Sequence, residues 1–152
     1  MMRKRLLILT VLMLCMLLLC GCSEKAGFTM DEFDMLLDSG AFDGSDMEEL
    51  EQDLLAGLYG VDPALIVKGV GYLASNTSVS ADELVMFITN NKEDAMTVEA
   101  AANKRIEAQI AMCRTYCPDA VPRLESALVE RRSNTVLVAV GDAGFIAELL
   151  AE

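Results

Sequence analysis

Apolar residues follow three different patterns along this chain. An uncharged apolar run fills residues 6–19, and farther on apolar residues either recur three and four positions apart or form short β-branched runs. The three-and-four spacing is typical of helices that bury one face, and the short runs are typical of buried strands. The pattern therefore predicts an apolar leader followed by a mixed helical and stranded domain.

Four segments after the leader have the spacing of amphipathic helices. Two capping boxes, Thr29 with Glu32 and Ser45 with Glu48, mark the starts of the first two. Pro118 ends the third and longest, because proline cannot continue a helix. The expected helices cover approximately residues 30–38, 46–59, 96–116 and 143–151.

Four other segments have the β-branched and apolar content of strands. The expected strands cover residues 66–73, 83–89, 127–132 and 135–140. Two strand pairs, each a hairpin, separated by a helix predict an α+β domain with a four-stranded antiparallel sheet covered by helices on one face, in the order ααββαββα. We place this single domain at residues 28–152.

The N-terminal segment has the features of an export signal. Three bases at residues 3–5 precede the apolar run, whose 14 residues suit a signal sequence and fall short of the roughly 20 that span a bilayer. The run ends in Leu19-Cys20-Gly21-Cys22. This sequence resembles the bacterial lipobox, in which the last cysteine becomes the new N-terminus and carries a thioether-linked diacylglycerol.

We therefore expect residues 1–21 to be a lipoprotein signal peptide and Cys22 to be the lipidated residue. Residues 22–27 would form a short tether, and two acyl chains would hold the domain on the extracytoplasmic face of the cell membrane. The alternatives are an uncleaved signal anchor and an ordinary secretory signal cut nearby.

Composition excludes several classes of function. The chain has 24 acidic and 12 basic residues, a net charge of −12, and loss of the three leader bases would make it −15. Such a charge argues against a nucleic-acid partner, because phosphate binding depends on Lys and Arg. Histidine is absent from the sequence, which removes His-based catalysis and most zinc sites. We expect no catalytic residue, no cofactor and no metal.

Cys113 and Cys117 are the two cysteines that follow Cys22. An exported protein meets surroundings that allow a disulfide between them. Residues four apart on a regular helix hold their Cα atoms about 6 Å apart with Cβ atoms aimed elsewhere, which disfavours that bond. We favour two small apolar residues on a buried helix face and keep the disulfide as the alternative.

Acidic residues are concentrated between Asp31 and Asp62, a segment with 11 acids and no base. An EF-hand calcium loop aligned with Gly44 at its sixth position lacks acids at its first, third and twelfth positions. Acidic residues are favourable at helix starts, so we interpret the segment as a solvated acidic surface.

Several short motifs occur here in a characteristic order. They are Leu58-Tyr59-Gly60-Val61-Asp62, then Val79-Ser80-Ala81-Asp82-Glu83-Leu84, then Arg105 and Gln109 on the long helix, followed by the C-terminal hairpin. Over roughly residues 45–150 they resemble the domain-of-unknown-function 4358 family of small lipoproteins from Gram-positive anaerobes. That family has no assigned activity, so the resemblance implies a fold and a location. We expect a structural role for Arg105 and Gln109.

These observations favour a membrane-anchored, non-catalytic binding or interaction module of the cell envelope. Its partners would be the membrane, through diacylglycerol on Cys22, and an envelope protein or ligand. The alternative is a small carboxylate-dependent hydrolase of envelope glycan. That enzyme would need two facing carboxylates about 5–9 Å apart, drawn from Asp82, Glu83 and the acids of residues 31–62.

Overall fold

The computed structural model describes residues 25–44, 46–77 and 79–151. The signal peptide, Cys22 and Ser45 of the second capping box lie outside the described residues. The helices are α2 (Met30–Leu37), α3 (Gln52–Tyr59), α4 (Lys92–Tyr116), α5 (Val121–Glu125) and α6 (Ala143–Leu149), with short 3-10 turns η1 (Pro63–Leu65) and η2 (Pro118–Ala120). The strands are β1 (Met47–Glu49), β2 (Ile66–Ala74), β3 (Glu83–Thr89), β4 (Leu128–Arg132) and β5 (Thr135–Val140).

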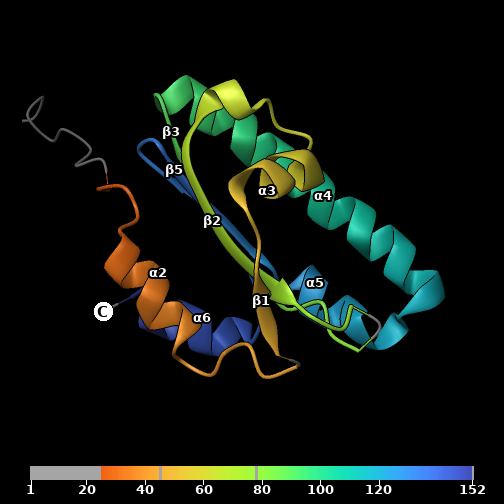
Figure 1. The fold of residues 1–152 in the computed structure, drawn as a ribbon. Coiled ribbons are helices and arrows are strands. Elements are labelled where there is room, and N and C mark those ends of the chain that lie inside the picture. The colour runs from red at the N-terminus through yellow and green to blue at the C-terminus, as the bar shows by residue number, and fades with distance from the viewer. Residues whose placement is uncertain (1–24, 45, 78, 152) are drawn as a thin grey trace, which may run out of the picture.

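The strands form one antiparallel sheet of five, in the order β1-β2-β3-β5-β4 (Figure 1). Strand β3 lies in the centre. Its register with β5 runs from Glu83 opposite Val140 at one end to Ile88 opposite Thr135 at the other. The α+β class and the antiparallel sheet are confirmed, and the prediction of four strands is wrong because the sheet has a fifth, β1.

The fifth strand comes from the start of the helix that we expected over residues 46–59. Met47–Glu49 pairs with the outer edge of β2, and the Leu50 N–H donates to the carbonyl of Gly71 at 2.9 Å. The helix α3 begins only at Gln52. The edge of β2 supplies hydrogen-bond partners for these residues, which a local sequence pattern cannot reveal. The exposed acids on β1 disfavour further strand pairing at the new sheet edge.

Helices cover both faces of the sheet, which corrects the expectation that they cover one. Figure 1 shows α3 and α4 on one side and α2 and α6 on the other. Val85 and Phe87 of β3 pack in the core with α3 and α4, whereas Leu84 and Met86 pack in the second core, with α2 and α6. A continuous apolar run, rather than an alternating one, marks a strand that is buried on both faces.

The first described residues, Lys25 to Phe28, lie at the end of the sheet that is farther from Glu83. The Phe28 N–H donates to Thr135 Oγ1 at 2.8 Å, and Lys25 Nζ lies 3.3 Å from Glu130 Oε1. Thr135 is five positions along β5 from Val140, the partner of Glu83, which corresponds to about 17 Å. Within the described ranges no helix is long and apolar enough to cross a bilayer.

Close packing of β2 against α3 yields a test of the core. A Cβ at Gly71 would lie 2.8 Å from Val85 Cγ2 and 2.9 Å from Leu55 Cδ2, both in the buried core. We expect Gly71→Ala to lower the free energy of unfolding in urea by about 1–3 kcal/mol through overpacking.

The matched control is Gly57→Ala on the exposed side of α3, where a Cβ meets nothing within 4 Å. Alanine is the better helix former, so this change should raise the free energy of unfolding by about 0.5–1 kcal/mol. An unchanged urea midpoint for Gly71→Ala would contradict the packing described here.

Candidate functional site

A buried carboxylate begins the central strand. Glu83 is the first residue of β3, and its side chain is 1% exposed. Arg105 of α4 donates from Nη2 to Oε2 at 2.9 Å and from Nε to Oε1 at 3.2 Å. Gln109, one turn on, donates from Nε2 to Oε2 at 3.4 Å, and the Tyr59 hydroxyl of α3 donates to Oε1. Both carboxylate oxygens are therefore occupied by groups from the two helices above the sheet.

Charge and burial both act on the pKa values of Arg105 and Tyr59. Burial by itself lowers the pKa of Arg105, but the hydrogen bond and charge of Glu83 outweigh it and raise that pKa. Burial, and then the charge of Glu83, hold the pKa of Tyr59 well above its usual range. The Arg105 guanidinium also lies 5.0 Å from the centre of the Tyr59 ring, a cation–π contact. Tyr59 therefore remains a neutral donor to a charged pair.

The preceding residue makes a second, separate ion pair. The Asp82 side chain is completely buried, accepts from the Gly44 N–H at 2.7 Å and binds Arg123 Nη1. Arg123 reaches on to Asp43, with Nη2 2.9 Å from Oδ1, and this hydrogen bond and charge lower the pKa of the Asp43 carboxyl. Successive residues of an extended chain point to opposite sides, which separates the Asp82 pair from the Glu83 pair.

The cysteines near the end of α4 form a disulfide. Cys113 and Cys117 are joined, with their Cα atoms 4.3 Å apart. Regular helical spacing had favoured two unpaired thiols, but α4 ends at Tyr116, and Cys117 adopts φ −148° and ψ 61°, outside the helical region. This turn ahead of Pro118 brings the two Cα atoms closer than a continuous helix allows, so the structure contains the disulfide that we kept as the alternative.

Two adjoining hollows lie beside the Glu83 network. One, of about 590 Å³, lies between α3 and α4, and the other, of about 250 Å³, lies over the start of β3. They share four lining residues, and we call them together the α3–α4 cleft. The shared residues are Leu58, Arg105, Gln109 and Met112.

The walls of the α3–α4 cleft are mainly apolar and small. The larger hollow is also lined by Gly57, Tyr59, Gly60, Ala101, Lys104 and Ala108. The smaller hollow is also lined by the apolar residues Leu73, Ala74, Ala81 and Leu124, and by Thr77, Ser80, Asp82, Glu83 and Cys113. Within the part of the chain that the structure describes, no three carboxylate, thiol or imidazole groups are placed to hold a metal ion.

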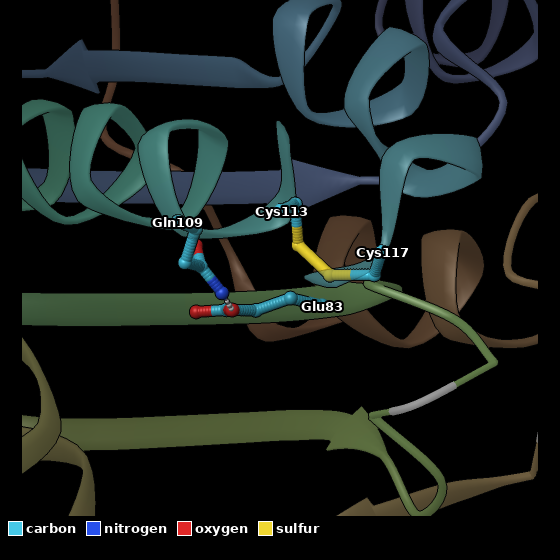
Figure 2. Close-up of a disulfide and its surroundings, with 4 residues drawn as sticks. All are labelled: Glu83, Gln109, Cys113 and Cys117. Carbon is cyan, nitrogen blue, oxygen red and sulfur yellow. Dashed lines mark hydrogen bonds between the residues drawn. A yellow bond between two sulfur atoms is a disulfide. The ribbon is translucent and has the colours of Figure 1, made fainter. Parts of the chain in front are cut away.

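Gln109 lies where the two hollows meet, beside the disulfide (Figure 2). Its amide nitrogen points to Glu83, as Figure 2 shows, and this fixes the orientation of the amide. Its oxygen, Oε1, is buried and has no hydrogen-bond partner among the described residues. A buried acceptor without a donor is costly, so a donor such as a water molecule or a group of a ligand would be favourable here.

The structure assembles residues that the sequence analysis treated separately. Asp82 and Glu83 were candidates for a facing pair of acids, but each binds its own arginine. Arg105 and Gln109 have the structural role that we expected, because both bind the buried carboxylate of Glu83. Two signals in the sequence could have indicated this network. One is an acid at the start of a strongly apolar strand, and the other is an Arg and a Gln four positions apart beside the apolar face of a helix.

The Glu83 pair leads to a prediction about stability. Glu83→Gln leaves the Arg105 charge, 14% exposed, without its carboxylate, and should lower the free energy of unfolding by about 3–5 kcal/mol. Glu125→Gln removes the partner of Arg114 on the surface and should change the free energy of unfolding by no more than about 0.5 kcal/mol. Adding Arg105→Met to Glu83→Gln removes both charges and should recover part of the loss in urea unfolding. Equal effects of Glu83→Gln and Glu125→Gln would contradict the buried pair.

The disulfide leads to a second prediction. Changing Cys113 and Cys117 together to serine should lower the free energy of unfolding by about 2 kcal/mol, the chain-entropy value for a loop this short. Dithiothreitol should lower the thermal midpoint of the natural chain and leave that of the double variant unchanged. A natural chain whose midpoint is insensitive to dithiothreitol would show that the bond does not stabilise the fold.

Comparison with known proteins identifies the domain. A search of curated proteins and a search of solved structures found no match. A family model does match, over residues 41–141, from the segment before β1 to the end of β5, and its description is "Domain of unknown function (DUF4358)". The matched region contains Glu83, Arg105, Gln109 and the α3–α4 cleft. The chain therefore belongs to the domain-of-unknown-function 4358 family.

Proposed function

We propose that this protein is a lipid-anchored, non-catalytic binding module on the extracytoplasmic face of the cell membrane. The observation that carries the binding role is the α3–α4 cleft, which is apolar along most of its wall and is bordered by the ion pairs of Glu83 with Arg105 and of Asp82 with Arg123. Binding sites for small ligands and peptides commonly combine an apolar wall with a few fixed polar groups.

The position of the cleft agrees with an anchor at Cys22. Two residues separate Cys22 from Lys25, so the Cα atoms are three chain steps apart, a reach of about 10 Å. A diacylglycerol on Cys22 would keep the entry of the chain, beside Thr135, close to the bilayer. Glu83 lies about 17 Å farther along the sheet. The cleft end of the domain would then be open to the envelope rather than to the membrane.

The state of the acids supports binding over catalysis. A glycan hydrolase needs one carboxyl group to give up a proton and a second to attack or to activate water. Asp82 and Glu83 are each buried and held by an arginine, so the geometry favours structural use of both. The hydrolase remains the alternative, and it would be supported if the purified chain released reducing ends from envelope glycan and Glu83→Gln abolished that release while the chain stayed folded.

Lipidation is tested directly in cells fed radiolabelled palmitate. We expect the natural chain to incorporate the label and to remain with the membrane, and Cys22→Ala to lose both properties. Cys20→Ala is the matched control, because it changes a neighbouring thiol and retains the lipobox, so labelling should persist. Equal labelling of Cys22→Ala and the natural chain, or a natural chain free in the cytosol, would contradict the anchor.

A further inference from the structure

We propose that the α3–α4 cleft binds the C-terminal end of a short apolar peptide. The peptide's carboxylate would lie at Lys104, one of its backbone N–H groups would donate to Gln109 Oε1, and an apolar side chain would pack between Leu58 and Met112. This inference rests on the proposed function as a binding module and names the class of its ligand.

The first argument is the buried acceptor. Gln109 Oε1 has no donor among the described residues, while the amide nitrogen is held by Glu83 through a bond of 3.4 Å. Gln109 lines both hollows, so its side chain borders the space in which a ligand would lie. The missing partner must be a donor. A peptide N–H is such a donor, whereas a simple alkyl carboxylate has none to offer.

The second argument is charge. The domain is strongly acidic, yet the larger hollow has Lys104 on its wall, and no described residue forms an ion pair with this lysine. Arg105, next to it, is committed to Glu83. An exposed, unpaired cation within an acidic surface selects for an anionic group on the ligand. A terminal carboxylate supplies one negative charge without requiring a second cation.

The third argument is shape. Gly57, Gly60, Ala101 and Ala108 have little or no side chain, so a peptide backbone can approach α3 and α4 closely between the larger Leu58 and Met112. Leu58 is 41% exposed and Met112 is 53% exposed, and both line the two hollows. Along α4, Lys104 and Met112 are about 12 Å apart, close to the length of three extended residues.

The experiment uses the full-length chain in nanodiscs of zwitterionic phospholipid and isothermal titration calorimetry. The probe is acetylated Ala-Ala-Leu with a free carboxylate, compared with the same peptide ending in an amide. We expect the carboxylate form to bind about fivefold more tightly, which is the scale of one exposed ion pair. Lys104→Gln should abolish this preference, and Lys68→Gln, an exposed lysine on β2, should preserve it.

A second pair of probes tests Gln109. Replacing the N–H of the last peptide bond by an ester oxygen should weaken binding to the natural chain about tenfold, the scale of one buried hydrogen bond. With Gln109→Leu the amide and the ester should bind alike. Leu58→Asp should weaken the binding of every probe more than tenfold, because it places a charge in the apolar wall.

Three results would overturn the proposal: absence of peptide binding, equal binding of the carboxylate and amide forms, and binding of dodecanoate in place of the peptide. None of them bears on the palmitate labelling of Cys22. Labelling without peptide binding would support the membrane location and contradict the peptide ligand. Peptide binding without labelling would support the ligand and contradict the lipid anchor.

Discussion

The buried ion pair of Glu83 and Arg105 is the constraint on which the helical layer over the cleft depends. A carboxylate enclosed at the start of a central strand costs several kcal/mol unless other groups replace its water. Here the replacements come from two helices: Tyr59 of α3 and both Arg105 and Gln109 of α4. Both helices must therefore cross the sheet where Glu83 lies. Its neighbour Asp82 fixes Arg123 of α5 in the same way.

This arrangement is the basis of our proposal that the α3–α4 cleft binds a ligand rather than catalyses a reaction. The carboxylates of Asp82 and Glu83 beside it are each paired with an arginine, and these ion pairs hold the walls in place. The disulfide joins Cys113 of α4 to Cys117, just after the end of that helix, and lies next to Gln109 (Figure 2). Among the residues described, Gln109 Oε1 is the one buried side-chain oxygen without a hydrogen-bond partner, and Gln109 lines both hollows.

Much of the fold could be predicted because its strongest signals are local. The runs 83–89 and 135–140 are rich in β-branched and apolar residues, and both are strands with the expected bounds. The error at residues 46–59 has a different origin: Met47–Glu49 has weak local preference and becomes a strand because β2 offers an unpaired edge. We also expected helices on one face of the sheet. The unbroken apolar content of β3 could have predicted that helices cover both faces.

The sequence by itself determined the apolar leader with its cysteine at position 22, the acidic character, most helices and strands, and the family resemblance. These depend on the order and type of nearby residues. Only the tertiary structure decided which residues meet at the cleft. Arg105 is 22 positions from Glu83 and Tyr59 is 24, and their contacts exist because the sheet order brings α3 and α4 over the start of β3. A charge pair depends on distance in space, which a linear pattern does not contain.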